Sequence, residues 1–256
     1  MKKQRLDVAL VERGLAETRS KAQSLIMARR VTINGQYVDK AGAGVGGDDD
    51  VAVVALEHPW VGRGGMKLAH ALAEMGIDVR EKVCADVGAS TGGFTDVLLK
   101  NGARRVYAID VGYGQLDASL RNDPRVVNRE KVNARYLEAG DFDEPIDFVS
   151  IDVSFISLTM ILPAVAKFLR GELVALIKPQ FEVGKADVGK GGIVRDDAKR
   201  AAAVDGVVLF ARSIGFDVKR VIESPIKGAE GNVEYLMYAA TGTSADPPAT
   251  TPAGRR

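Results

Sequence analysis

Helix-like and strand-like segments alternate along the chain from residue 67 to residue 240. Parallel strands of one sheet need a helical crossover between them, so this alternation predicts a doubly wound α/β sheet. Seven strand-like runs lie at 83–87, 105–110, 125–128, 146–152, 172–178, 217–223 and 233–240, and helical patterns lie at 67–76, 93–101, 157–168 and 196–213. The last two runs are separated only by a turn-rich stretch, and we expect them to pair antiparallel at the end of the sheet.

Residues 1–58 follow another pattern and are expected to form a separate small α+β module. The stretch "RLDVALVERG" has apolar residues at helical spacing and ends at Gly14. The stretch "TRSKAQSLIMARR" starts at Thr18, a residue type that caps helices, and predicts a second helix. The stretch "VTINGQYVD" predicts a hairpin that turns at Asn34 and Gly35.

Three further stretches complete the expected domain organisation. Residues 59–66 contain three glycines and are expected to form a linker, in which Trp60 packs between the two modules. Residues 67–240 are expected to form the large α/β domain. The tail, 241–256, is too polar and too rich in proline to fold by itself, so we expect it to be disordered.

Composition narrows the class of protein. Of the 256 residues, 46% are hydrophobic, which is enough for a packed core. Cys84 is the only cysteine, so no internal disulfide can form, and this suits a reducing cytosol. No apolar run approaches the ~20 residues that a membrane span requires, and the start "MKKQRLD" does not continue as a signal peptide. We therefore expect a cytoplasmic protein with no membrane partner.

Positive charge is concentrated near the N-terminus, although the whole chain carries a formal net charge of only +1. Residues 1–46 contain nine lysines and arginines and four acids, which leaves a net charge of +5, and the acidic triplet at 48–50 follows directly. An excess of this kind is commonly a solvated surface, but it also suits a nucleic-acid partner.

This N-terminal stretch resembles the S-four-type RNA-binding domain, named after a small-subunit ribosomal protein. The resemblance is carried by "RLDVALVERG", "SKAQSLIMARRV" and "INGQYV". It implies that the basic second helix lies on folded RNA and holds phosphates by charge. One departure is Arg29, where the family usually has a glycine. The expected RNA-binding residues are Arg5, Arg19, Lys21, Arg29, Arg30, Arg63, Lys185 and Lys190.

A glycine-rich turn follows the first strand of the large domain and reads "GASTGG" from Gly88 to Gly93. A dinucleotide site needs glycine at the middle position, where the backbone approaches a pyrophosphate, but this chain has Ser90 there. Asp110 ends the second strand, 22 residues after Gly88, where a carboxylate can take both hydroxyls of a ribose. The spacing favours S-adenosylmethionine over NAD, and a tight turn without a ligand is a third interpretation.

The strand ends beside this turn complete the expected cofactor site. Asn133 and Ala134 follow the third strand and are expected to contact the edge of an adenine. The full set of expected cofactor-binding residues is Asp86, Gly88, Ala89, Ser90, Thr91, Gly92, Gly93, Phe94, Asp110, Val111, Asn133, Ala134 and Asp152. No metal ion is expected, and the sequence sets no oligomeric state.

Four ionisable residues stand where the pattern calls for apolar or neutral ones: Lys67, Asp152, Lys178 and Glu234. Lys67 opens the first helix of the large domain, Asp152 and Lys178 each follow an apolar strand, and Glu234 interrupts an apolar strand. Each of them alone could be a charged residue at the edge of the sheet. A carboxylate in the middle of an apolar strand, such as Glu234, needs a cationic partner. Together they suit methyl transfer to an RNA 2′-hydroxyl, with Lys178 favoured as the base, its pKa lowered by burial and a second cation, and Lys67 orienting the oxygen.

Nearly the whole chain resembles the TlyA family, the hemolysin A-like rRNA methyltransferases. After the S-four-type domain, this resemblance is carried by "GRGGMKL", "DVGASTGGFTDVLL", "IDVSFISL", "LIKPQFEVGK", "GKGGIVRD" and "EGNVEYL". It implies an FtsJ-like Rossmann methyltransferase that uses S-adenosylmethionine to modify cytidine 2′-hydroxyls in 16S and 23S ribosomal RNA. The family's catalytic tetrad then falls on the same four ionisable residues. Gly62 departs from the family, which often has a serine there.

The glycine-rich stretch 179–194 has two interpretations. It is either a plain surface loop or a lid over the exposed ribose of the target nucleotide. Two other functions also stay open for the chain. It could be a non-catalytic RNA-binding or ribosome-assembly factor, or a hemolysin, although no basic amphipathic helix suited to membranes is evident.

Overall fold

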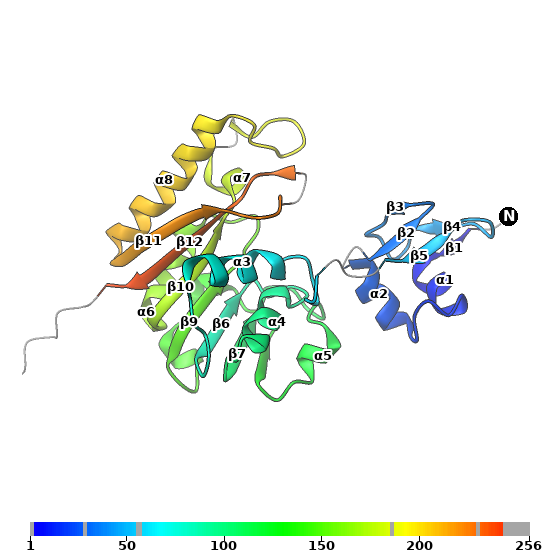
Figure 1. The fold of residues 1–256 in the computed structure, drawn as a ribbon, viewed down its shortest axis with the longest axis horizontal. Coiled ribbons are helices and arrows are strands. Elements are labelled where there is room, and N and C mark those ends of the chain that lie inside the picture. The colour runs from blue at the N-terminus through cyan, green and yellow to red at the C-terminus, as the bar shows by residue number, and fades with distance from the viewer. Residues whose placement is uncertain (1–2, 28–29, 55–57, 185–186, 229–230, 243–256) are drawn as a thin grey trace, which may run out of the picture.

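The computed structural model describes residues 3–27, 30–54, 58–184, 187–228 and 231–242. Figure 1 shows a large module, built around one sheet, and a small N-terminal module beside it. Residues 58–64 form turns that lead into the first helix of the large module. The chain thus has the two-module organisation that its change of pattern near residue 60 suggests, while the predicted limits at 58 and 66 stay predictions.

The small module folds as two helices against short strands. Its elements are β1 (Gln4–Arg5), α1 (Leu6–Glu12), α2 (Arg19–Met27), β2 (Val31–Ile33), β3 (Gln36–Tyr37), β4 (Gly44–Val45) and β5 (Val51–Val53). The hydroxyl of Thr18 accepts the N–H of Lys21, 3.1 Å away, and so caps α2 as expected. The predicted hairpin also forms, because Asn34 and Gly35 both have positive φ and let β2 pair with β3. Leu6, Leu10 and Ile26 form its core.

The large module is a seven-stranded sheet in the order β11-β12-β10-β9-β6-β7-β8. Its strands are β6 (Val83–Val87), β7 (Arg105–Ile109), β8 (Val126–Arg129), β9 (Ile146–Ile151), β10 (Leu169–Ile177), β11 (Phe216–Glu223) and β12 (Tyr235–Thr241). Its α-helices are α3 (Gly65–Met75), α4 (Gly93–Lys100), α5 (Ala118–Arg121), α6 (Leu162–Phe168), α7 (Pro179–Glu182) and α8 (Asp197–Ser213). Strands β6 to β10 are parallel, and β12 is antiparallel to both of its neighbours.

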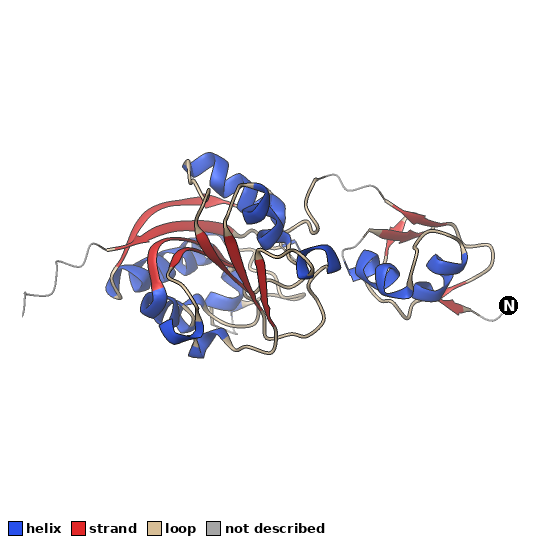
Figure 2. Ribbon diagram, turned by 90° about the horizontal axis from the view of Figure 1, so that it is seen from below, coloured by secondary structure: helices blue, strands red, loops and turns tan. Residues whose placement is uncertain are grey.

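Helices cover both faces of this sheet, as Figure 2 shows. Alternate residues of β6 face opposite sides, so Val83, Ala85 and Val87 pack with α6 and α8 while Cys84 packs with α3 and α4. A parallel sheet is stable when it is buried on both faces, and this explains why its central strands are almost wholly apolar.

The predicted elements of the large module match this fold, with differences at their ends. All seven strands and the antiparallel terminal pair are confirmed. The predicted helix at 157–168 is wrong at its start, because a short 3₁₀ turn, η3 (Leu158–Met160), precedes α6. Pro163 explains the break, since its ring would clash with the carbonyl four residues earlier in a continuous helix. The short helices α5 and α7 were not predicted.

Trp60 lies on the large module beside the N-terminal module. It packs against the cluster formed with α3 and α4, and Nζ of Lys100 lies 5.3 Å from the centre of its ring. It also lines a cleft with Leu25 and Met27 of α2. This position agrees with a packing residue between the modules, and a role in coupling them stays a prediction. Among the described residues, no helix is both long and apolar enough to cross a membrane.

Candidate active site

The predicted cofactor turn lies between β6 and α4, at the carboxyl edge of the sheet. Gly88 has φ of +88°, and a Cβ atom there would lie 2.4 Å from the carbonyl oxygen of Asp152. Gly92 has φ of +98°, and a Cβ atom there would lie 2.2 Å from a methyl group of Leu120. Both positions therefore require glycine. Ser90 also has positive φ, at 48°, so the backbone is bent at this position although the residue is not glycine.

Asp110 stands at the end of β7, beside this turn. Its carboxylate accepts the N–H of Ser90 at 2.8 Å and the N–H of Gly112 at 2.7 Å. Its carbonyl oxygen accepts the N–H of Val132, which brings the segment after β8 alongside. Asn133 begins the 3₁₀ turn at Ala134–Tyr136 in this segment, and the turn's first residue is the predicted Ala134. The carboxyl ends of β6, β7 and β8 thus meet at one rim, beside the Asp110 carboxylate.

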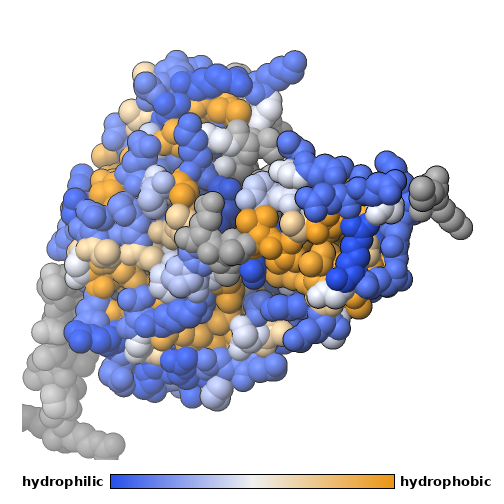
Figure 3. All heavy atoms as spheres, turned by 45° about the vertical axis from the view of Figure 1, so that its right-hand side comes forward, coloured by the Kyte–Doolittle hydropathy of each residue, from blue (hydrophilic) through white to orange (hydrophobic). Residues whose placement is uncertain are grey.

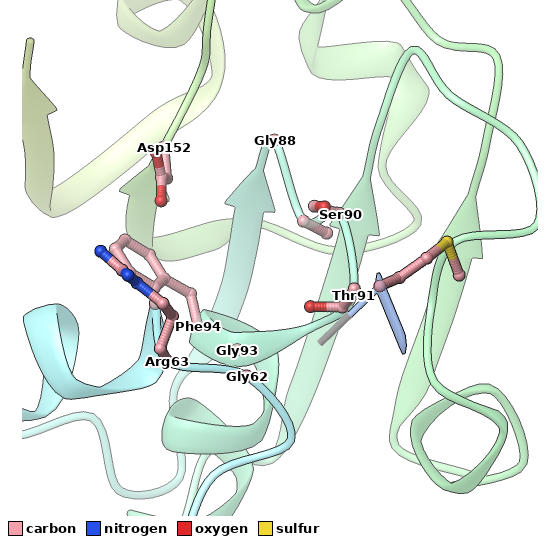
Figure 4. Close-up of a pocket in the computed structure, with 11 residues that line it drawn as sticks. Gly62, Arg63, Gly88, Ser90, Thr91, Gly93, Phe94 and Asp152 are labelled. Carbon is pink, nitrogen blue, oxygen red and sulfur yellow. The ribbon is translucent and has the colours of Figure 1, made fainter. Parts of the chain in front are cut away.

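A hollow lies between the turn and the segment that enters α3 (Figure 4). Its walls are formed by Met27, Gly62, Arg63, Gly64, Gly88, Ala89, Ser90, Thr91, Gly93, Phe94 and Asp152. In Figure 4 the side chains of Arg63 and Asp152 lie on one side, with Ser90 and Thr91 on the other. A Cβ atom on Gly93 would lie 2.9 Å from the backbone nitrogen of Gly65, so only glycine lets these two loops approach so closely.

Six of the predicted cofactor residues are not in the walls of this hollow: Asp86, Gly92, Asp110, Val111, Asn133 and Ala134. Asp86 is fully buried behind the turn, where its carboxylate accepts the hydroxyls of Thr95 at 2.7 Å and Ser150 at 3.0 Å. Burial raises the pKa of this carboxyl to about 7, against the effect of the two hydroxyls. Val111 is 73% exposed, next to Asp110.

The four unexpected ionisable residues form two buried ion pairs. Nζ of Lys67 lies 2.5 Å from Glu234, and both side chains are almost fully buried. Nζ of Lys178 lies 2.6 Å from Asp152 and donates to the hydroxyl of Ser154 at 2.8 Å. Each carboxylate thus provides the partner that a buried lysine requires.

Sheet register places these two pairs at the same edge. Tyr235 pairs with Ile177 at the end of the antiparallel ladder, so Glu234 and Lys178, which are next to this pair in the chain, stand at the same end of β12 and β10. Strand β9, which leads to Asp152, lies on the other side of β10. Gly64 lies near both pairs. A Cβ atom on Gly64 would lie 3.9 Å from the Asp152 carboxylate, and the Gly64 carbonyl accepts the N–H of Lys67. The structure brings the four residues together next to the cofactor turn.

The predicted RNA-binding residues are distributed over both modules. Arg5 and Arg19 both bind the buried carboxylate of Asp7, with 52% and 57% of their side chains exposed. Lys21 is exposed on α2 and Lys190 on the loop after α7, and Arg30 is half-buried at the start of β2. Arg63 donates to the carbonyl oxygen of Lys227. The remaining two, Arg29 and Lys185, lie outside the described residues.

Sequence reasoning missed three residues that matter to these sites. Asp7 lies at an apolar position of a predicted helix, which was a usable signal for a buried carboxylate. Ser154, which holds Lys178, and Phe155 carry no comparable signal. Phe155 is 91% exposed beside the ion pairs and has φ of +64°, a conformation that side chains of its size rarely adopt.

Comparison with known proteins agrees with this geometry. Residues 60–241 match the FtsJ-like methyltransferase family, and residues 4–51 match the S4 domain. The chain belongs to the FtsJ-like methyltransferase family. The resemblances stated from the sequence are thus confirmed for both domains. Among the described residues, no cluster of three or more histidine, cysteine, aspartate or glutamate side chains could hold a metal ion.

Several relatives of this FtsJ-like methyltransferase extend along most of the chain. It is 47% identical to the 16S/23S rRNA (cytidine-2′-O)-methyltransferase TlyA of Mycobacterium tuberculosis, over 93% of this chain and 90% of that protein. It is also 47% identical to Hemolysin A of Brachyspira hyodysenteriae, over 91% and 98% of the two chains. A solved structure of a hemolysin candidate from Streptococcus thermophilus superposes with a TM-score of 0.75 at 45% identity, covering 95% and 90% of the two chains.

Proposed function

We propose that this chain transfers a methyl group from S-adenosylmethionine to the 2′-hydroxyl of a cytidine in ribosomal RNA. The observation that supports this most directly is the meeting of two lysine–carboxylate pairs with a glycine turn at one sheet edge. The relative from Mycobacterium tuberculosis is named for the same reaction on 16S and 23S rRNA. Ribosomal subunits are the proposed partner, and the cytoplasm, where they are found, is the proposed location.

The glycine turn and Asp110 would hold the cofactor. The close approach of Gly88 and Gly93 to neighbouring backbone leaves a hollow that any larger residue would fill. Asp110 already accepts two backbone N–H groups, and its remaining lone pairs are available to ribose hydroxyls. Arg63 is the cation in the described wall of the hollow, which suits a ligand without a pyrophosphate. Asn133 and Ala134 would meet the adenine.

The two ion pairs would place the attacking oxygen. S-adenosylmethionine, when bound, supplies an already activated methyl group on a positively charged sulfur. The oxygen of the 2′-hydroxyl would form the new bond to this carbon as the carbon–sulfur bond breaks, and the hydroxyl would lose its proton. We propose that Lys178 gives up its own proton before the reaction and then, as a neutral amine, contacts this hydroxyl and receives its proton, with Lys67 orienting the oxygen. Asp152, Ser154 and Glu234 then hold the two lysines, and positioning supplies much of the rate.

The S4 domain would supply most of the affinity for RNA. Arg5 and Arg19 expose their guanidinium groups on one side of this domain, where they can hold phosphates. In Figure 3 the visible face is mostly hydrophilic, and a continuous hydrophobic area lies on the N-terminal module.

Near the ion pairs, the exposed ring of Phe155 is suited to stack on a base that has left its helix.

Replacing Lys178 tests this proposal. We expect Lys178→Ala to lower kcat for transfer of tritiated methyl groups to ribosomal subunits by about 100-fold or more, because the group beside the hydroxyl is lost. Cofactor affinity, measured by calorimetry, should stay close to that of the unchanged protein. Lys219→Ala removes a half-exposed surface lysine of β11 and serves as the control.

Two outcomes would contradict the proposal. Full transfer by Lys178→Ala would remove this lysine from the chemistry. Tight RNA binding by the unchanged protein with no transfer at all would favour the other function considered, a non-catalytic RNA-binding or assembly factor. Mapping of 2′-O-methyl groups on the product RNA identifies the subunit and the nucleotide.

A further inference from the structure

Strands β9 and β10 are neighbours in the sheet. Each is followed by one residue of the ion pair between Asp152 and Lys178, and then by a short segment that leaves the sheet. Strand β9 ends at Ile151, and residues 152–158 lead from Asp152 into η3. Strand β10 ends at Ile177, and residues 178–182 lead from Lys178 through α7. Since the strands are parallel neighbours, the two segments leave the sheet at the same edge, side by side.

Side chains connect these two segments along their whole length. At the sheet end, Lys178 contacts Asp152 and Ser154, at 2.6 and 2.8 Å. Further along, the rings of Phe155 and Phe181 lie 5.2 Å apart, centre to centre. At the far end, one carboxylate oxygen of Glu182 accepts the hydroxyl of Ser157 at 2.6 Å and the other accepts the N–H of Leu158 at 2.9 Å.

Glu182 caps the start of η3 from another part of the chain. The first N–H groups of a helical turn lack partners within it, and a carboxylate there also meets the positive end of the peptide dipoles. Burial raises the pKa of the Glu182 carboxyl, against the two hydrogen bonds from Leu158 and Ser157. An apolar residue would fill this space without that cost, so packing alone does not explain the carboxylate.

We propose that Glu182 is a positioning residue for methyl transfer. Its carboxylate locks residues 152–158 against residues 178–182, and so fixes Asp152 and Lys178 relative to each other. This inference rests on the proposed function, because Glu182 acts through the position of Lys178.

The backbone of the first segment shows why such a lock is needed. Phe155 holds a left-handed conformation, at φ of +64°, with a side chain that is 91% exposed. A strained residue of this kind keeps its conformation only where the surrounding contacts over-determine it. Ser154 binds Lys178 on one side of Phe155, and Ser157 binds Glu182 on the other. Without Glu182 the strain can relax, and Ser154 and Asp152 would move with the segment.

The experiment compares Glu182→Ala, Glu182→Gln and Ser157→Ala with Glu74→Ala, which removes an exposed carboxylate of α3. Methyl transfer to ribosomal subunits gives kcat and KM, and calorimetry gives cofactor affinity. We expect Glu182→Ala to lower kcat about 10- to 100-fold, because misplacement of a reacting group by about 1 Å has an effect of this size. KM for RNA and cofactor affinity should stay within about threefold, since the binding groups remain.

The conservative variants separate positioning from folding. Glu182→Gln keeps an acceptor for the N–H of Leu158, and we expect its kcat to be about tenfold higher than that of Glu182→Ala. Ser157→Ala should lower kcat less than Glu182→Ala, because Leu158 keeps its partner. If Glu182→Ala does not fold, these two variants carry the test.

Separate results would overturn this inference and the proposed function. Wild-type kcat in Glu182→Ala, or a loss of kcat matched by an equal loss of cofactor affinity, contradicts a positioning role while the enzyme itself remains active. Absence of transfer by the unchanged protein contradicts the proposed function, and the inference falls with it.

Discussion

Asp7 of the S4 domain and Asp86 of the methyltransferase domain are both fully buried, but they have different neighbours. Asp7 accepts hydrogen bonds from Arg5, Arg19 and Gln23. These contacts, led by the Arg5 hydrogen bond, hold the pKa of the Asp7 carboxyl well below its usual range, although burial alone would raise it. Asp86 has no arginine partner and accepts the hydroxyls of Thr95 and Ser150 and the backbone N–H of Thr95, and burial raises its pKa to about 7.

The difference teaches how each domain uses a buried acid. In the S4 domain the carboxylate stays charged because Arg5 and Arg19, whose side chains are about half exposed, donate hydrogen bonds to it. The same contacts hold those guanidinium groups in place, where we propose that they bind RNA phosphates. In the methyltransferase domain the nearby charge of Asp152 adds to the effect of burial on Asp86. This acid joins β6 to α4 and β9, and so supports the turn from behind.

Substitution of Asp86 should give the largest effect, and it depends on pH. A raised pKa means that the folded protein binds the proton more tightly than the unfolded chain does. This stabilisation is present below about pH 4 and is lost as the pH rises through the folded value of about 7. Asp86→Asn does not titrate. We therefore expect the free energy of unfolding of the wild type to fall relative to that of the variant, by about 4 kcal/mol between about pH 4 and pH 8.

Urea unfolding at several pH values measures this difference. Thr95→Val is the control, because it removes one hydroxyl partner and keeps the acid. A difference between wild type and Asp86→Asn that stays constant over this range would contradict the raised pKa.

Substitution of Asp7 should give a smaller effect of opposite pH dependence. Asp7→Ala removes the acceptor of two arginines and Gln23, and we expect the S4 domain to lose about 2 kcal/mol of stability, since the half-exposed arginines can be hydrated instead. The lowered pKa means that the stabilisation is present above about pH 4 and is lost as the pH falls below it.

Thermal unfolding of the variant and the wild type at neutral and acidic pH checks this prediction. The two curves should converge in acid. If the melting temperatures of the two proteins differ by the same amount at both pH values, the charge of Asp7 adds no stability beyond that of its packing.

Substitution of Arg19 should change stability least and RNA binding more. Its side chain is 57% exposed, so its ion pair with Asp7 adds little stability. We expect Arg19→Ala to weaken RNA binding and to reduce the slope of log affinity against log salt by about 0.7 to 0.9, as expected for the loss of one phosphate contact. Filter binding over a salt series measures this slope, and Glu17→Ala, an exposed neighbour, is the control. An unchanged slope would remove Arg19 from the RNA interface.

Much of the fold follows from local pattern. The seven strands, the hairpin at Asn34 and Gly35, and the Thr18 cap were all predictable, because each depends on residues within a few positions of one another. The helix ends were less predictable. The start of α6 depends on one proline, and α7 is a four-residue turn that packs against α8.

The candidate site was predictable in part, and for a related reason. Polar residues at the ends of apolar strands mark a sheet edge, which is why Lys178 and Asp152 were noticed. The placement of Asp86 behind the turn, rather than in the hollow, did not follow from its spacing. Alternation along β6 sets the face of the sheet to which the Asp86 side chain points. Its partners Ser150 and Thr95 reach it because β9 and α4 pack beside β6.

The amino-acid sequence by itself determined which segments become helices or strands, where the chain must bend, and which charges stand in apolar surroundings. Only the tertiary structure decided how those charges pair. Lys67 and Glu234 are 167 residues apart, and they meet because β12 inserts between β11 and β10 while α3 packs against it. Backbone bending is set by sterics within one or two residues, whereas the partner of a buried charge is set by strand order, to which every strand of the sheet contributes.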